Sequence, residues 1–101
     1  MRGPLASHQA LIPVHLEDSA EAELLAITRY LATLGVRRAE EFVAIFWSVV
    51  EDLRAFPALG QHIAGDKRVL RRGVYRFVYQ LRDEDVLILR ILDGRGQHDL
   101  P

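Results

Sequence analysis

The chain has 101 residues, of which 50% are hydrophobic and 27% are charged, and it contains no cysteine. This length and composition predict one globular domain with a single core and argue against a disordered protein. The absence of cysteine excludes disulfides, thiolate zinc sites and cysteine nucleophiles. No apolar run reaches the ~20 residues of a membrane span, and the first residues lack a signal-peptide core, so we expect a cytoplasmic protein.

We expect residues 1–10 to be a flexible leader, either native or left from cloning, and residues 11–101 to form the domain. The net charge of −1 hides an uneven distribution of charge. Residues 1–66 carry five basic and nine acidic side chains, and residues 67–101 carry eight and five. Six basic residues and no acidic residue lie between positions 67 and 82. This basic segment either attracts phosphate or an acidic protein partner, or is a solvated edge that discourages aggregation between strands.

A first strand is predicted over residues 11–16, where Val14 and Leu16 share one face and His15 points to the other. Asp18 or Ser19 is the predicted N-cap of a first helix. Apolar residues then follow at helical spacing: Ala20, Leu24, Ile27, Leu31 and Leu34. Gly35 is expected to end this helix.

A second helix is predicted to follow at once and to end before Pro57, because proline disfavours a helical residue in front of it. Its apolar stripe has spacings of three and four: Ala39, Phe42, Phe46, Val49, Leu53 and Phe56. The two helices should form an antiparallel hairpin. Trp47 lies off this stripe, so it either widens the core or marks a contact surface, and we expect core.

The remainder of the chain predicts three strands, over residues 67–72, 74–81 and 86–92, and a polar tail over residues 93–101. Residues 82–85 are the expected turn between the last two strands. The order is β-α-α-β-β-β, which indicates an α+β domain with a helix hairpin packed on a small antiparallel sheet.

The register of the last hairpin decides where its charges point. Pairing Leu81 with Val86 would mix charge into an aromatic face. Pairing Leu81 with Leu87 and Phe77 with Ile91 separates apolar from polar side chains, and we adopt it. The predicted inner face then holds seven residues: Tyr75, Phe77, Tyr79, Leu81, Leu87, Leu89 and Ile91. The outer face carries Arg76, Gln80 and Arg90 together.

The common enzymatic motifs are missing: there is no phosphate-binding glycine loop, no HExxH and no GxSxG. The sequence predicts no cofactor and no metal site, and the acidic residues 83–85 are expected to be a solvated turn. Candidates for chemistry are therefore the arginine face of the sheet and two residues of the tail, Arg95 and His98.

From residue 11 to residue 99 the chain resembles the RelE/ParE superfamily of bacterial type II toxin–antitoxin toxins. The resemblance rests on the order and spacing of five stretches. They are Val14–Tyr30, Gly35-x3-Ala39-x2-Phe42, Phe56-Pro57-x2-Gly60, Gly73-Val-Tyr-Arg76-Phe-Val-Tyr79 and Val86-Leu-Ile-Leu-Arg-Ile-Leu92-x-Gly94-Arg95.

The resemblance implies one of two activities. RelE-like members are ribosome-dependent mRNA endonucleases, and ParE-like members share the fold and inhibit DNA gyrase. The RelE-like catalytic positions correspond here to Lys67, Arg76 and Arg95, with His98 as a substitute for a missing tail tyrosine. A second family lysine is replaced by Val69. These departures, together with the long helix pair and the Pro57-x2-Gly60 turn, favour a ParE-like toxin.

The resemblance also implies partners: a cognate antitoxin, and either DNA gyrase or the ribosome with its mRNA. Four residues are the predicted partner contacts: Arg71, Arg72, Arg90 and Trp47. A third possibility is a non-toxic interaction module that keeps the fold. No membrane association is expected.

Overall fold

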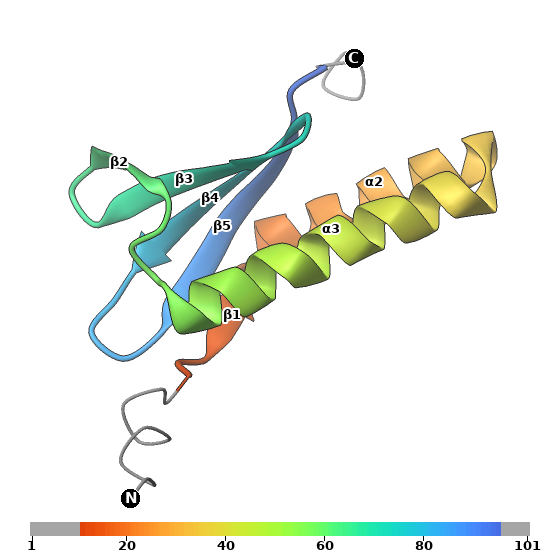
Figure 1. Ribbon diagram of the computed structural model, residues 1–101. Coiled ribbons are helices and arrows are strands. Elements are labelled where there is room, and N and C mark those ends of the chain that lie inside the picture. The colour runs from red at the N-terminus through yellow and green to blue at the C-terminus, as the bar shows by residue number, and fades with distance from the viewer. Residues whose placement is uncertain (1–10, 96–101) are drawn as a thin grey trace, which may run out of the picture.

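The computed structural model describes residues 11–95. β1 (Val14–Leu16) leads into two helices, α2 (Asp18–Leu34) and α3 (Val36–Ala55). The strands that follow are β2 (Gln61–Ala64), β3 (Lys67–Arg72), β4 (Tyr75–Leu81) and β5 (Val86–Asp93). Figure 1 shows both helices on one side of the sheet. The predicted α+β fold, a helix hairpin packed on a sheet, is confirmed.

The helix boundaries agree with the sequence signals, except at the start of α2. Gly35 separates the helices with a φ of 156°, an angle that L side chains rarely adopt, and its N–H closes α2 on the carbonyl of Leu31. Asp18 is the first helical residue, and no side chain caps this end. The predicted capping by Asp18 or Ser19 is therefore wrong. The Ser19 hydroxyl instead donates to the carbonyl of Leu89 on β5.

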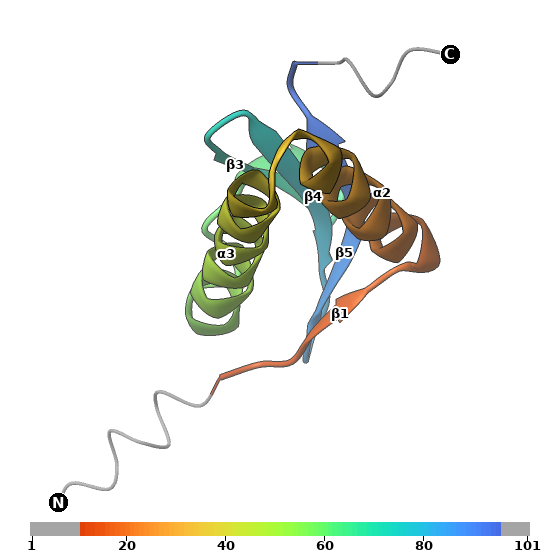
Figure 2. The ribbon, with the colours of Figure 1, turned by 90° about the vertical axis from the view of Figure 1, so that its right-hand side faces the viewer.

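The core lies between the helix hairpin and the inner face of the sheet (Figure 2). The predicted stripes supply most of it, including Ile27 from α2 and Phe42 from α3, which are 2% and 1% exposed. The last residues of both stripes do not take part, because Leu34 is 51% exposed and Phe56 is 66% exposed. Leu34 is the last residue of α2, at the tip of the helix hairpin, and Phe56 directly follows the last residue of α3.

The sheet has the order β1-β5-β4-β3-β2 and is mixed, since β1 runs parallel to β5 and the other neighbours are antiparallel. The expectation of a wholly antiparallel sheet thus misses the parallel edge. β1 is shorter than predicted and begins at Val14. β2 was not predicted, because all four of its residues are exposed and carry no apolar alternation.

The predicted register of β4 and β5 holds at one end of the hairpin and is wrong at the other. Phe77 pairs with Ile91 as expected, but Leu81 pairs with Val86, and the register shifts between Val78 and Tyr79. One extra residue in β5 therefore bulges out of the ladder. Consequently Val86 and Ile88 are fully buried, and Leu87 and Leu89, which were predicted to face the helices, are only half-buried.

The start of α2 covers the β5 edge beyond the end of β1. The N–H of Glu17 donates to the carbonyl of Ile88, and the carboxylate of Glu23 accepts the N–H of Ile91 at 2.8 Å. The same carboxylate binds the guanidinium of Arg90 at 2.6 Å. Arg90 therefore reaches towards α2, although the sequence placed it beside Arg76 on the outer face. These bonds satisfy an edge that would otherwise present unpaired backbone groups.

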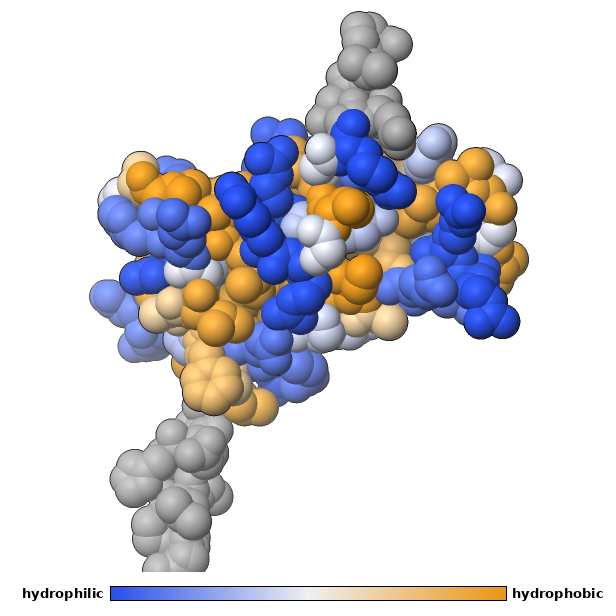
Figure 3. Space-filling model, turned by 45° about the horizontal axis from the view of Figure 1, so that its top comes forward, coloured by the Kyte–Doolittle hydropathy of each residue, from blue (hydrophilic) through white to orange (hydrophobic). Residues whose placement is uncertain are grey.

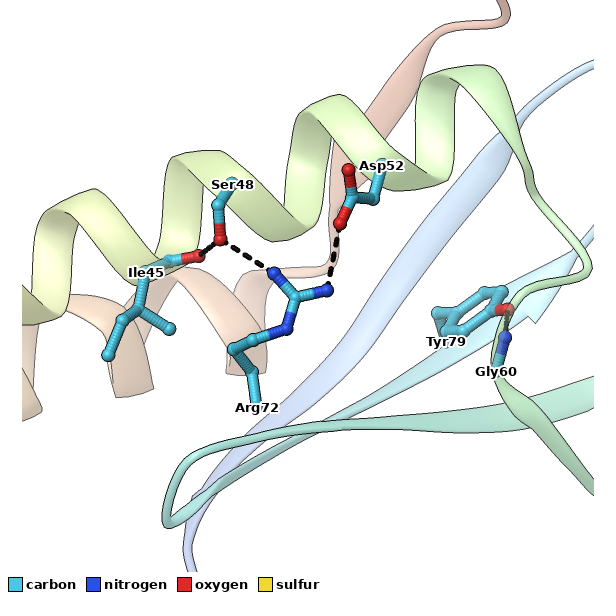
Figure 4. A network of polar contacts seen from close by, with 6 residues as sticks. All are labelled: Ile45, Ser48, Asp52, Gly60, Arg72 and Tyr79. Atoms are coloured by element: carbon cyan, nitrogen blue, oxygen red, sulfur yellow. Dashed lines mark hydrogen bonds and ion pairs between the residues drawn. The ribbon is translucent and has the colours of Figure 1, made fainter.

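Two polar ties join the helix layer and the α3–β2 connection to the sheet (Figure 4). Arg72 of β3 donates to the Ser48 hydroxyl and to the Asp52 carboxylate of α3, both at 2.8 Å. The Tyr79 hydroxyl of β4 accepts the N–H of Gly60 at 2.9 Å. Arg72 was a predicted partner contact, but its side chain instead binds Ser48 and Asp52 within the protein.

Candidate functional site

The site is built on the turn between β3 and β4. Arg71 lies directly opposite Arg76 in the ladder. Both side chains are exposed and point away from the helices, because their neighbours Arg72 and Tyr75 point towards them. Gly73 has a φ of 59°, and glycine adopts this conformation without strain at the first central position of a two-residue hairpin turn. The turn therefore holds the two guanidinium groups on one face.

Arg95 reaches the same turn from the end of β5. The N–H of Gly94 donates to the carbonyl of Val74, and a Cβ at Gly94 would lie 2.6 Å from that oxygen. Only a glycine allows the backbone to pass this closely. Arg76 and Arg95, which lie nineteen residues apart in the sequence, consequently line one open pocket of about 370 Å³ together with Arg71.

A buried carboxylate orients Arg95. Asp93 is 3% exposed, and it accepts hydrogen bonds from Nε of Arg95 at 3.0 Å and from Nη2 at 2.9 Å. These hydrogen bonds raise the pKa of the Arg95 guanidinium. The Tyr75 hydroxyl accepts a further bond from Nη2 at 3.2 Å. Burial raises the pKa of this phenol, so it stays protonated at neutral pH.

The electrostatic character of the pocket is one-sided. Its lining residues are Arg71, Gly73, Val74, Arg76, Gly94 and Arg95, and every charge among them is positive. Within residues 11–95, neither Arg71 nor Arg76 has a hydrogen bond or an ion pair through its side chain. Figure 3 shows hydrophilic side chains interleaved with apolar ones over the visible face. The arrangement can bind an anion.

The predicted catalytic set is only partly brought together. Lys67 pairs with Gln80 at the opposite end of β3. It is four residues from Arg71, or about 13 Å along the strand. His98 lies outside the described residues. The sequence did not point to Tyr75 or Asp93 as supports for Arg95, because Asp93 had been assigned to a polar tail.

Trp47 is 56% exposed, so the expectation that it belongs to the core is wrong. Its ring packs edge-on against Phe46, at a centroid distance of 5.2 Å. Together with residues of β1 and α2, such as Leu16 and Leu24, it lines a mostly apolar pocket of about 430 Å³. Trp47 thus fits the alternative assignment, a contact surface, and its pocket shares no lining residue with the pocket of Arg71, Arg76 and Arg95.

Comparison with known proteins places the chain in a family. A family model described as the ParE toxin of the type II toxin–antitoxin system, parDE, matches residues 14–98. The chain belongs to the ParE toxin family. The predicted RelE/ParE superfamily membership is confirmed, with the ParE-like branch favoured as expected.

Individual relatives agree with this assignment. Toxin ParE3 of Caulobacter vibrioides is 43% identical to this ParE-family chain over 68 residues, which cover 60% of this chain and 64% of that protein. The match therefore spans slightly less than two thirds of the relative's length. Two solved structures share the fold. One belongs to the chromosomal ParDE system of P. aeruginosa, with a TM-score of 0.66 and 21% identity over 83% of this chain and 97% of that chain.

The other belongs to the RelBE2 toxin–antitoxin complex of Mycobacterium tuberculosis, with a TM-score of 0.59 and 24% identity. The match covers 83% of this chain and 92% of that chain. At sequence identities below 25%, both structures support the fold alone. Neither helix of the described part of this ParE-family chain is long and apolar enough to cross a membrane.

Proposed function

We propose that this chain is the toxin of a type II toxin–antitoxin pair, that it inhibits growth through DNA gyrase, and that a cognate antitoxin neutralises it. Membership of the ParE family over residues 14–98 supports the proposal. The chemistry of the pocket lined by Arg71, Arg76 and Arg95, called here the arginine pocket, argues against mRNA cleavage. Its described side chains offer positive charge and hydrogen-bond donors, and no acid–base pair.

Cleavage of mRNA through the ribose 2′-OH requires a group that removes a proton from that hydroxyl. Arginine cannot act as this base, because its guanidinium is not deprotonated in proteins. Among the predicted catalytic residues that the structure describes, Lys67 is the one that is not an arginine. It pairs with Gln80 and lies about 13 Å along the strand from Arg71. The pocket is thus suited to binding an anion rather than to moving a proton, which favours the ParE-like activity.

An antitoxin partner is proposed because both solved relatives come from toxin–antitoxin systems. On the sheet face away from the helices, Lys67, Arg71 and Arg76 are exposed and lack partners among residues 11–95. An acidic segment that folds on binding could cover this face and neutralise its charge. The expected antitoxin is therefore a small protein with an acidic segment, encoded by a neighbouring gene.

Growth tests the toxin assignment. Expression of the chain alone should arrest growth, and co-expression with the neighbouring gene product should restore it. Normal growth with abundant folded protein would favour the remaining alternative, a non-toxic interaction module.

Two assays on the wild-type protein separate the targets: supercoiling by purified gyrase, and mRNA cleavage on translating ribosomes. Loss of supercoiling without cleavage is the expected result. Codon-specific cleavage with normal supercoiling would replace the gyrase proposal by the RelE-like one, with His98 as the first residue to test.

A further inference from the structure

α3 carries a second stripe of side chains, on a face turned away from the core. The core stripe of this helix, which includes Phe42 and Phe46, is buried. The members of the second stripe have helical spacings of three and four, and all are exposed: Arg37, Glu40, Ala44, Trp47 and Glu51. A large exposed aromatic side chain in the middle of a helix is typical of a protein interface. This outer stripe is therefore a candidate contact surface.

An open pocket of about 420 Å³ lies beside the outer stripe, between the two helices. Ala32 of α2 and Val36 and Val43 of α3 supply apolar walls. Glu40 also lines the pocket, and its carboxylate has no side-chain partner within residues 11–95. Trp47 follows one helical turn after the last residue of the pocket, Ala44. The same helix face therefore carries a large protruding side chain and, next to it, a hollow.

We propose that two copies of this chain associate through their outer stripes, with the α3 helices antiparallel and the twofold axis at Ala44. In a twofold dimer every contact occurs twice. Trp47 lies three residues after the axis, so it faces the position three residues before the axis in the second copy. That position borders the pocket. The indole of each copy thus enters the pocket of the other, where the Glu40 carboxylate can accept the indole N–H.

The charges of the outer stripe favour a second copy as the partner. Arg37 and Glu51 each lie seven residues, or about 10 Å, from Ala44 along the helix. The twofold axis consequently places Arg37 of each copy opposite Glu51 of the other. Arg37 has no side-chain partner within residues 11–95, and the described contact of Glu51 is an exposed one with Arg54 at 3.5 Å. The small side chain of Ala44 allows the two helices to approach closely at the axis.

The interface is small, because it uses one face of α3 and the adjoining edge of α2. Interfaces that bury less than about 1,200 Å² belong to weak, reversible complexes. The dilute chain is therefore a monomer in which Trp47 is solvated, and the dimer forms as the concentration rises. This inference goes beyond the proposed function and depends neither on toxicity nor on gyrase.

Sedimentation equilibrium of the purified full-length chain over a concentration series tests the dimer. The average mass should rise towards twice that of one chain, and the Trp47 emission should shift to the blue over the same range. Trp47→Ala should weaken dimerisation about 30-fold or more, because each dimer loses two buried indoles. Phe56→Ala is the matched control, since Phe56 is an exposed aromatic residue outside the outer stripe. It should dimerise as the wild type does.

Charge reversal tests the register of the dimer. Arg37→Glu and Glu51→Arg should each weaken self-association about tenfold, because like charges then face each other at both ends of the interface. An equimolar mixture of the two variants should form a heterodimer with the affinity of the wild type, since opposite charges again meet at both ends. Glu84→Arg, in the exposed turn between β4 and β5, is the control and should self-associate normally.

Three results would overturn the proposal. A wild type that stays monomeric at every concentration would do so, and would leave the outer stripe for a helix of another protein. A dimer that persists unchanged in Trp47→Ala would place the interface elsewhere. A mixture of the two charge variants that associates no more tightly than either variant alone would exclude the twofold register. None of these results changes the expected growth and supercoiling assays, so the two proposals fail separately.

Discussion

The hydroxyl of Tyr79 accepts a hydrogen bond from the backbone N–H of Gly60 at 2.9 Å, and the aromatic ring occupies the space that a side chain at position 60 would need. A Cβ at Gly60 would lie 2.7 Å from Cε1 of Tyr79 and 2.8 Å from the carbonyl oxygen of Val69. The same hydroxyl donates to the carbonyl of Pro57 at 2.7 Å. One phenol therefore anchors the whole connection between α3 and β2.

Tyr79→Phe should lower the free energy of unfolding by about 1–3 kcal/mol, because it leaves the buried N–H of Gly60 without an acceptor. Urea denaturation measures the change. Tyr30→Phe, at a residue that is 42% exposed, is the control and should change stability by less than about 0.5 kcal/mol. Equal effects of the two substitutions would show that the Tyr79 hydroxyl does not hold the connection.

The stability of the protein should fall at alkaline pH. Burial raises the pKa of Tyr79 above its ordinary value of 10.0, so the folded state disfavours the phenolate. The contribution is fully present below the unfolded pKa of about 10 and is lost as the pH rises through the folded value. Tyr79→Phe should flatten this decline but not remove it, since burial also raises the pKa of Tyr75. Parallel declines of wild type and variant in denaturation at rising pH would contradict the prediction.

Glu23→Ala should expose the β5 edge, because its carboxylate accepts the N–H of Ile91 and binds Arg90. We expect a loss of about 1–3 kcal/mol and faster hydrogen exchange at the Ile91 amide. Glu21→Ala is the control, since Glu21 lies two residues before Glu23 on α2 but is exposed. Unchanged protection of Ile91 in Glu23→Ala would rule out this role.

Trp47 is the only tryptophan of the chain, so its fluorescence reports directly on its exposure. At 56% exposed, it should emit as a solvated indole and be quenched readily by acrylamide. Trp47→Ala should change the free energy of unfolding by less than about 1 kcal/mol. A blue-shifted emission that resists quenching would instead place Trp47 in an interface.

Arg82 and Asp85 form a bidentate pair, with N–O distances of 2.6 and 2.8 Å, at the turn between β4 and β5. Hydrogen bonding from Arg82 lowers the pKa of Asp85, so this carboxylate contributes stability above its unfolded pKa and loses it as the pH falls through the folded value. Arg82→Ala should raise the pKa of Asp85 in an NMR titration of the carboxyl carbon. Arg29→Ala should leave it unchanged, and the same result for both variants would exclude the pair as the cause.

The helices could be predicted from the sequence because their signals are local. Three- and four-residue spacings, Gly35 and Pro57 fix the hairpin within a few residues, whatever packs against it. The strands could be located for the same reason, as the alternation in β4 shows. β2 could not, since an edge strand with no buried side chain has no such pattern.

Contacts between distant segments required the tertiary structure. The bulge in β5 turns Leu87 and Leu89 away from the core, and the extra residue produces no local signal. Arg71 and Arg72 are adjacent and chemically identical, yet Arg72 binds Asp52 of α3 and Arg71 lines the arginine pocket. Strand alternation sends consecutive side chains to opposite faces, and only the packing of the helices decides which face is buried. The sequence alone therefore determined the two helices, every strand except β2, and the supply of arginines. Tertiary packing decided which arginines form hydrogen bonds within the protein and which stay exposed.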